Sequence, residues 1–387
     1  MTRSSTSTQS YDFDLNGIVG IRLLDAYRTD LATVAKQLGP LRADLDREPD
    51  LTIRFVDQMT TGPLTYVGMG DTGFNDDGFF VLRGRGNVAA TALIPFGDIG
   101  HQPHILCERA MPSVPHLLAI INLTALAKGV LPLHASAFTI GPVGVLVTGW
   151  AKSGKTECLL AGMAEGGTYI GDEWVYLSPD RQMFGLPEPI RLWAWHFDQL
   201  PDLLNERPRA DRIRLQAWKA ATTMTRGGAS SHLPGSRLVR RGAPVIERQA
   251  YLQIPPEELF GTDRVALKGH LDSVVLVLSH SAQGIAAGPA GPTEVSGRML
   301  ASLADERAPF MAHYRQFRYA FPEQTSAAVD AAHDREGRLL TDLFDGRPAA
   351  KVAHPYPCDI TALGRAVRSA ARDVAQPRTT ECEVEAS

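Results

Sequence analysis

The sequence predicts an α/β protein in which a strand–loop–helix domain follows a mixed α+β accessory domain. The clearest sign is a short β-branched run at 144–148 that leads, through a glycine-rich loop, into helical spacing at 157–163. Short alternating runs between residues 11 and 105 indicate several strands ahead of it. The length of 387 residues is enough for two or three domains with buried cores.

These observations divide the chain into four parts. They are a disordered tail over 1–10, a strand-rich accessory domain over 11–110, the strand–loop–helix domain over 111–375, and a disordered tail over 376–387. The composition is typical of a globular protein, with 44% hydrophobic and 21% charged residues. The 39 basic and 43 acidic residues leave a net charge of −4, so we expect no binding to nucleic acid or to an anionic membrane.

Cysteine usage and the apolar runs indicate the compartment. The four cysteines are scattered, without a C-x-x-C pair or metal-ligand spacing, which favours a reducing environment. The first ten residues are polar and lack the apolar core of a signal peptide. The longest apolar stretch, 114–127, is shorter than the about 20 residues that a membrane span requires. We therefore expect a cytoplasmic protein.

Periodicity and turn residues predict the elements in order. The accessory domain should hold a helix at 25–38, ended by Gly39-Pro40, and strands at 50–56, 64–67, 78–82 and 87–96. The second domain should hold strands at 131–140, 144–148, 168–177 and 272–280, and helices at 114–128, 157–163, 295–308, 323–344 and 360–371. Residues 317–322 form an aromatic connector, and 354–357 form a rigid turn in which His354 is structural.

The glycine-rich loop is a complete G-x-x-x-x-G-K-[ST] phosphate-binding motif. Its residues, all expected to contact nucleotide, are Gly149, Trp150, Ala151, Lys152, Ser153, Gly154, Lys155 and Thr156. The glycines let backbone N–H groups turn inward, and the helix that follows adds its dipole, so the loop suits a di- or triphosphate. Lys155 would reach the terminal phosphates and the Thr156 hydroxyl would bind Mg²⁺. ATP and Mg²⁺ are therefore the expected ligands.

Two adjacent carboxylates, Asp172 and Glu173, follow Gly171 inside an otherwise apolar strand. Burying them is costly unless they meet cations, and a Mg²⁺–nucleotide site supplies such cations. Because neighbouring strand residues face opposite sides, both can reach the phosphates only at a strand end or a bulge, which Gly171 could provide. The alternative is an edge strand with solvated acids. His134, on the preceding strand, could orient a phosphate or an acid, or be a structural residue.

His134, the loop 149–156 and the pair Asp172-Glu173 are similar in order and spacing to the catalytic domain of HPr kinase/phosphorylase. The resemblance covers residues 131–177 and implies a P-loop fold of the type shared with phosphoenolpyruvate carboxykinase. It implies transfer of the ATP γ-phosphoryl group to a hydroxyl, usually of a protein serine. In that reading Asp172 is the catalytic base, Glu173 helps to hold Mg²⁺, Lys155 stabilises the phosphates and His134 assists.

This sequence departs from the family's pattern at two places. This chain has Glu173 where the family has a second aspartate, and the family's Glu-Ile-Arg-Gly segment has only a loose counterpart at 185–191. From that counterpart, Glu188 is a candidate for a further metal ligand, and Arg191 is a candidate residue of the site. The family's habit of forming rings implies a homo-oligomer.

The rest of the chain constrains function less. The strand at 272–280 ends without the acid of an ordinary Walker B motif, which argues against motor and transporter ATPases. Basic runs at 207–214 and 237–241 flank a Gly/Ser/Thr stretch at 222–234, which predicts a mobile loop. That loop could close over nucleotide, or its flanks could be solvated surface charge.

Three functions remain open from the sequence. The first is a kinase of a protein or peptide serine, and the second is a kinase of a small-molecule hydroxyl. The third is a regulatory or assembly module that binds ATP without turning it over. All three use the same loop, so the loop alone does not separate them.

Overall fold

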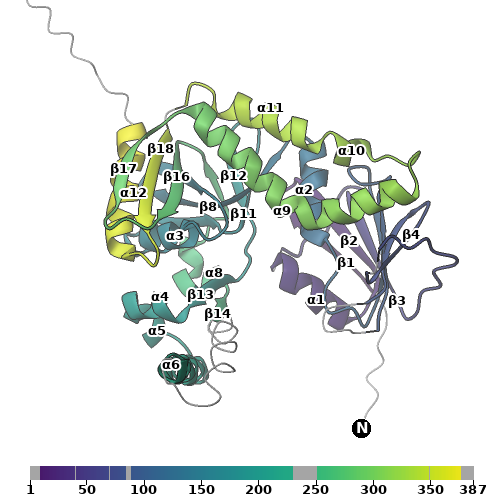
Figure 1. The fold of residues 1–387 in the computed structure, drawn as a ribbon, viewed down its shortest axis with the longest axis horizontal. Coiled ribbons are helices and arrows are strands. Elements are labelled where there is room, and N and C mark those ends of the chain that lie inside the picture. Colours follow the sequence, from purple (N-terminus) through teal and green to yellow (C-terminus); the bar gives the residue numbers. More distant parts are fainter. Residues whose placement is uncertain are drawn as a thin grey trace, which may run out of the picture. The chain divides into compact units, whose positions relative to one another are not determined.

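The computed structural model describes residues 9–39, 41–68, 70–83, 89–229, 251–347 and 349–375 (Figure 1). The chain forms two compact units, the first from residues 1–188 and 266–387 and the second from 189–265. Helices and both parallel and antiparallel strand pairs are present, which confirms the α/β expectation. The expected boundary near residue 110 falls within the first unit and stays a prediction.

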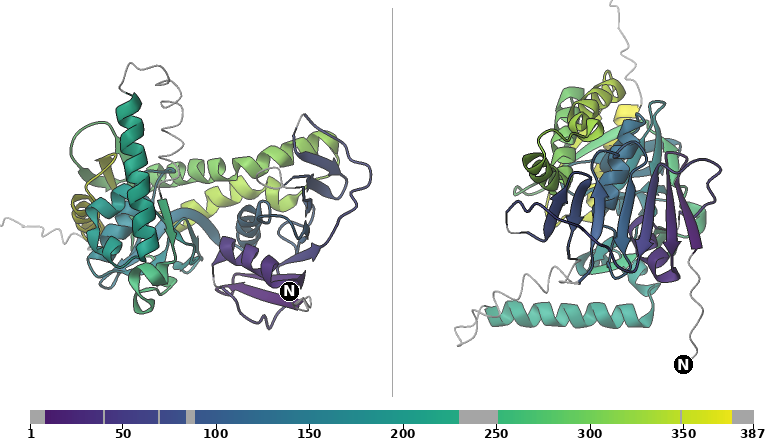
Figure 2. Two further views of the ribbon diagram at one scale, coloured as in Figure 1. Left: turned by 90° about the horizontal axis from the view of Figure 1, so that it is seen from below. Right: turned by 90° about the vertical axis from the view of Figure 1, so that its right-hand side faces the viewer.

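The N-terminal part of the first unit is a mixed sheet. Its strands, seven among the residues described, are β1 (Gln9–Leu15), β2 (Val19–Ala26), β3 (Leu51–Val56), β4 (Thr72–Asn75), β5 (Gly78–Val81), β6 (Ala92–Pro95) and β7 (His104–Glu108). They lie in the order β1-β2-β3-β7-β6-β5-β4, in which β2, β3 and β7 run parallel (Figure 2). Helix α1 (Arg28–Leu38) connects β2 to β3 and buries Val34 and Leu38.

Three predictions for this part need correction. Gln9 and Ser10, expected in a disordered tail, belong to β1, because β2 pairs along it as far as Gln9 and Ala26. The helix expected from residue 25 begins at Arg28, since β2 extends to Ala26. The strand expected at 64–67 is a single bridge between Thr65 and Phe74, and that expected at 87–96 shortens to β6, with 87 and 88 outside the described residues.

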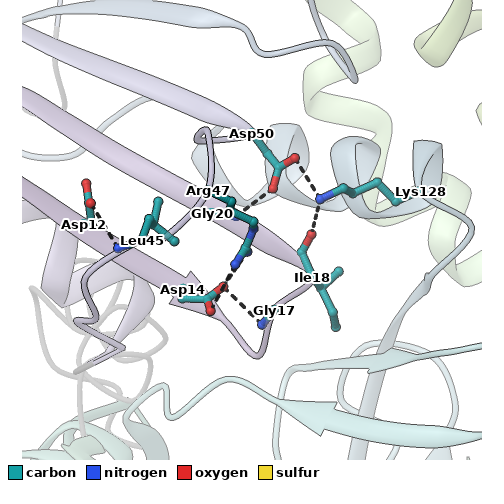
Figure 3. Close-up of polar contacts among 9 residues, drawn as sticks. All are labelled: Asp12, Asp14, Gly17, Ile18, Gly20, Leu45, Arg47, Asp50 and Lys128. Atoms are coloured by element: carbon teal, nitrogen blue, oxygen red, sulfur yellow. Dashed lines mark hydrogen bonds and ion pairs between the residues drawn. The ribbon is translucent and has the colours of Figure 1, made fainter.

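Helix α2 (Leu117–Ala127) is tied to this sheet by its end (Figure 3). Lys128, directly after the helix, donates to the carbonyl oxygen of Ile18 at 2.7 Å and pairs with Asp50 at 2.7 Å. Asp50 in turn accepts from the backbone N–H of Gly20 at 2.8 Å. The turn between β1 and β2 is thereby fixed to the helix that leads into the second sheet.

The second sheet carries the phosphate-binding motif. Its strands, nine among the residues described, are β8 (Leu131–Ile140), β9 (Val143–Thr148), β10 (Thr168–Gly171), β11 (Trp174–Leu177), β12 (Gln182–Gly185), β15 (Lys268–His270), β16 (Ser273–His280), β17 (Ala286–Ala290) and β18 (Ala349–Pro355). The order is β15-β12-β11-β8-β9-β16-β18-β17, and β10 also pairs with β8. The strand before the motif, β9, thus lies between an antiparallel neighbour, β8, and a parallel one, β16.

Helices α3 (Lys155–Ala164), α9 (Pro292–Ala320), α11 (Ala332–Phe344) and α12 (Ile360–Ala375) contact this sheet, whereas α10 (Ala327–Asp330) packs on α2 and α11 (Figure 1). The expected aromatic connector at 317–322 is wrong, because α9 continues to Ala320 and buries Phe317 against Phe96 at 4.7 Å between ring centroids. The helix expected at 323–344 is divided into α10 and α11.

The second unit holds a two-stranded sheet among its described residues. Its elements are β13 (Ile190–Trp193), α4 (Ala194–Gln199), α5 (Pro201–Asn205), α6 (Arg209–Ala229), β14 (Tyr251–Ile254), α8 (Pro256–Phe260) and the 3₁₀ turn η1 (Thr262–Arg264). Figure 2 shows α6 as one long helix. The mobile loop expected from residue 222 is wrong as far as Ala229, since an established helix extends at low cost into such residues. The remainder of that loop and the basic run at 237–241 lie outside the described residues.

The described helices contain no segment whose length and apolarity would let it cross a membrane.

A partly buried histidine pair in the first unit predicts sensitivity to acid. His116, before α2, lies with Nε2 at 3.0 Å from Nδ1 of His313 on α9, beside the ring of Phe79. Burial, and then the charge of His313, lowers the pKa of His116 to about 4. Between pH 6.5 and 4 the unfolded chain therefore binds more protons at His116 than the folded one. The contribution of neutral His116 to the free energy of unfolding is fully present above pH 6.5 and is lost as the pH falls towards 4.

We expect the free energy of unfolding, measured with urea, to fall by about 3 kcal/mol between pH 7 and pH 4 through this group alone. His116→Asn should flatten that dependence, because asparagine tolerates the residue's φ of 54° and does not titrate. The same pH dependence in wild type and variant would contradict the assignment.

Candidate active site

The phosphate-binding motif forms a tight loop between β9 and α3. Gly149 leaves no room for a side chain, since a Cβ there would lie 2.5 Å from the carbonyl oxygen of Val277 and 2.4 Å from Oγ of Ser153. Trp150, Ala151 and Lys152 are exposed on the outside of the loop, whereas Ser153, Gly154 and Lys155 are buried. The side chain that the motif assigns to phosphate is therefore held inside the loop.

Several features of this loop fit a phosphate. The buried Oγ of Ser153 has no hydrogen-bond partner among the described residues, and the start of α3 directs its free N–H groups at the loop. The ammonium of Lys155 donates to the carbonyl oxygens of Gly149 at 3.3 Å and Trp150 at 3.0 Å. Burial lowers the pKa of Lys155, and the surrounding carboxylates, Glu173 and Asp172 first, oppose that shift. The residues present therefore suit the phosphates of a nucleotide.

His354, at the end of β18, supports the loop from behind. Its Nε2 lies 2.7 Å from the carbonyl oxygen of Ser153 and its Nδ1 lies 2.8 Å from that of Pro355, and the side chain is fully buried. Carbonyl oxygens only accept, so the ring donates to Ser153 when the proton is on Nε2. The expected structural role of His354 thus takes a specific form, which is to fix the backbone of the loop.

Gly154→Ala is therefore expected to weaken ADP binding at least about tenfold. Gly154 has a φ of +105°, and an added Cβ would lie 2.3 Å from Nε2 of His354. Isothermal titration calorimetry would measure the loss. Gly166→Ala is the matched control, since Gly166 has a φ of +88° with nothing within 4 Å of an added Cβ. Equal effects of the two changes would show that a general loss of stability, and not the contact of Gly154 with His354, is responsible.

Asp172 and Glu173 lie at an irregularity where β8 changes partner. β10 pairs with residues 137–139 of β8 and β11 pairs with 131–134, and the register shifts at Gly171. Glu173 has a φ of 67°, so the backbone between the two strands turns sharply. Both carboxylates can then face the motif, which confirms the predicted bulge. The alternative of solvated acids on an edge strand is wrong for Asp172, which is 3% exposed.

Asp172 joins the sheet to the motif. Its Oδ2 accepts from Oγ1 of Thr156 at 3.0 Å, and its Oδ1 accepts from Oγ of Ser136 on β8 in a short contact. Burial, and then the negative charge of Glu173, raises the pKa of Asp172 to about 6, although both hydroxyls stabilise its ionised form. Ser136 was not among the predicted residues, yet it lies two positions beyond His134 and thus on the same face of the strand.

Glu173 belongs to a second cluster, built around His134. Nε2 of His134 lies 3.0 Å from Oε2 of Glu173, and its Nδ1 lies 2.5 Å from Oε1 of Glu306 on α9. Burial opposes protonation of His134, but the two carboxylates outweigh it and raise the pKa of the imidazole. The ring also stacks on Trp174 at 5.8 Å. Sequence reasoning missed Glu306, because nothing in the pattern of α9 distinguishes it from the acidic residue before it.

Two further predicted residues are Glu188 and Arg191. Burial raises the pKa of Tyr169 and of Tyr176; the charge of Glu188 adds to this effect for both, after that of Asp172 in the case of Tyr169. Arg191 belongs to the second unit, where its guanidinium lies 5.0 Å from the ring centroid of Tyr251. Their part in the site stays a prediction.

A metal at this site would need ligands besides protein side chains. The described residues contain no group of three or more His, Cys, Asp or Glu side chains arranged to hold a metal ion. Mg²⁺ in nucleotide sites usually takes one or two protein oxygens and completes its shell with phosphates and water. The hydroxyl of Thr156 and the carboxylate of Asp172, which are already adjacent, fit that requirement.

Comparison with known proteins adds no relative to this description: neither a protein-family model nor a curated protein matches the chain.

Proposed function

We propose that the protein is a P-loop kinase of the HPr kinase type, which transfers the γ-phosphoryl group of ATP to the hydroxyl of a serine in a protein or peptide. The observation that carries this proposal is the hydrogen bond between Thr156 of the loop and Asp172, an acid supplied by the β10–β11 bulge and not by the neighbouring parallel strand β16. β16 ends in Leu278, Ser279 and His280, so an ordinary Walker B acid is missing there. Two further features support the kinase proposal. The strand β8 lies antiparallel beside β9, and His134, the loop and the two acids follow one another along the chain in the order of that family.

The proposed reaction is a direct displacement at phosphorus. The oxygen of the acceptor hydroxyl forms a bond to the γ-phosphorus, the bond from that phosphorus to the bridging oxygen of ADP breaks, and the hydroxyl proton passes to a carboxylate. Lys155 would stabilise the negative charge on the phosphates, as would the backbone N–H groups of the loop. Mg²⁺, held by Thr156 and Asp172, would neutralise further charge on the phosphate oxygens.

The geometry favours a division of roles between the two acids that differs from the one implied by the family resemblance. Asp172 is almost completely buried and both of its oxygens accept hydrogen bonds, one of them from the expected metal ligand Thr156. Glu173 is 46% exposed and lies against His134. A base must reach the proton of an incoming acceptor, so we assign metal binding to Asp172 and proton acceptance to Glu173. His134, in contact with Glu306, would keep Glu173 oriented.

Transfer of label from γ-³²P-ATP tests this function. Purified protein with Mg²⁺ would be incubated with fractionated lysate of its host and with a library of serine peptides, beside a Lys155→Ala variant. We expect label in a serine of at least one acceptor, only with the intact protein and only when Mg²⁺ is present. Tight nucleotide binding without label in any protein, peptide or metabolite would overturn the proposal and leave a nucleotide-binding module.

A further inference from the structure

A cavity of about 220 Å³ lies in the first unit between α2, α9, α11 and the β8–β11 pair. Pro132 of β8 and Trp174 of β11 line it from the sheet, and Ala119 lines it from α2. Four leucines form half of the remaining lining, so an apolar ligand group seated against them could displace water from the cavity at a favourable free energy.

Four polar residues, Asn122, Glu306, Arg307 and Glu336, also line the cavity, and each of them contacts a polar side chain of the protein. Arg307 on α9 and Glu336 on α11 form a largely buried, bidentate ion pair. Asn122 on α2 accepts from the hydroxyl of Tyr176 at 2.8 Å through its Oδ1, and the side chain is 9% exposed. Because Asn122 lines the cavity and its amide nitrogen is a donor, a ligand with one acceptor oxygen could hydrogen-bond to it.

The cavity borders the His134 cluster, which lies between it and Glu173. Glu306 lines it, and the same carboxylate contacts Nδ1 of His134, whose Nε2 meets Glu173. Pro132, His134 and Ser136 occupy alternate positions of β8 and therefore share one face, about 7 Å apart from one to the next. Along that face the cavity, the histidine cluster and the Asp172–Thr156 contact follow one another. A group seated at Pro132 would thus present an attached hydroxyl near Glu173.

We propose that this cavity is the specificity pocket for the phosphate acceptor, and that it binds a compact apolar group attached to the acceptor hydroxyl. The inference rests on the proposed function. A cavity of 150 Å³ holds the six carbons of benzene, so 220 Å³ accommodates about nine non-hydrogen atoms. A leucine or phenylalanine side chain beside the acceptor serine fits that limit, with a peptide carbonyl as the hydrogen-bond acceptor for Asn122. An apolar small-molecule alcohol has the same chemistry.

Binding of defined probes tests the pocket without turnover, and incubation of the same probes with ATP separates the two sources. Saturation-transfer NMR on the protein with Mg²⁺ and ADP would compare acetyl-Phe-Ser-amide, acetyl-Asp-Ser-amide and benzyl alcohol. We expect the Phe-Ser probe to bind at least about tenfold more tightly than the Asp-Ser probe, because only the former can fill the cavity. Benzyl alcohol should compete with it. If benzyl alcohol, and not the Phe-Ser probe, becomes phosphorylated, the natural acceptor is a small alcohol.

Filling the cavity provides the decisive variant. Ala119→Phe should raise the Kd of the Phe-Ser probe at least about tenfold, whereas Ala32→Phe, on an exposed face of α1, should not. Leu118→Phe, a smaller change in the same wall, serves if Ala119→Phe does not fold. Equal binding of the Phe-Ser and Asp-Ser probes, or binding unaffected by either filling variant, overturns the proposal. Cavity-dependent probe binding without any label transfer would instead overturn the kinase function, so the two failures are distinct.

Discussion

Lys155→Ala should lower kcat/KM for phosphoryl transfer about a thousandfold, which corresponds to about 4 kcal/mol of transition-state stabilisation. The reason is its position: the Lys155 side chain is 6% exposed and lies inside the loop, within the field of Asp172, Glu173 and Glu306. Its removal leaves those carboxylates without the cation that offsets their charge, and leaves the phosphates without their principal counter-charge. Initial rates of label transfer at several ATP concentrations would measure the loss.

The matched control is Lys36→Ala, an exposed lysine on α1 that removes the same charge from the chain. It should leave kcat/KM unchanged, because a surface charge contributes little. A melting curve for each variant shows whether the fold is intact. Transfer that survives in a folded Lys155→Ala protein would show that the loop does not hold the reacting phosphates, and the proposed function would fall with it.

The sequence predicts those parts of the site whose conformation depends on residues adjacent to one another in the chain. The loop from Gly149 to Thr156 needs only its own glycines and the helix start that follows, so its pattern specifies its conformation, while its nucleotide ligand stays a prediction. The pair Asp172-Glu173 is also readable, because two acids in an apolar strand require a local cause, and the break after Gly171 supplies it. The loop's presence and the bulge could both be predicted for this reason.

Other parts of the site depend on how distant segments meet. Glu306 reaches His134 only because α9 packs over β8, and the helical pattern of α9 does not say which acid will face the sheet. His354 contacts the loop because β18 is parallel to β16, which in turn is parallel to β9. No local pattern encodes that strand order. Ser136 is the exception, since alternation along β8 from His134 could have identified it.

The errors in helix length have the same origin. α9 continues through Pro309 to Ala320, although proline and the aromatic run suggested an earlier end. Packing supplies what the local pattern lacks, because Phe310 and Phe317 both lie against Phe96, directly after β6, and His313 lies against Phe79 of β5. One helix thus contributes Glu306 to the His134 cluster and aromatic contacts to the other sheet of the unit. Tertiary burial decided the length of α9 against its local preferences.

Glu173→Gln is the second change with a large expected effect. We expect kcat to fall about 10²- to 10⁴-fold while the Kd for ADP with Mg²⁺ changes little, because the amide keeps the size of the side chain but accepts no proton. Asp172→Asn should act differently. It removes the carboxylate that accepts from Thr156, so it should weaken Mg²⁺-dependent ADP binding as well as turnover. Single-turnover label transfer and calorimetry with and without Mg²⁺ separate the two effects.

Comparison of these two variants decides which acid is the base. The two carboxylates are adjacent in sequence but have different partners. Asp172 accepts hydrogen bonds from two hydroxyls, and Glu173 lies against an imidazole, so the two variants should have different effects. If Glu173→Gln weakens Mg²⁺-dependent binding and Asp172→Asn affects only kcat, the roles implied by the family resemblance hold and ours are reversed. Glu306→Gln then tests the cluster itself. If His134 orients Glu173, that change should lower kcat about tenfold without altering ADP binding, since the imidazole keeps one carboxylate and loses the other.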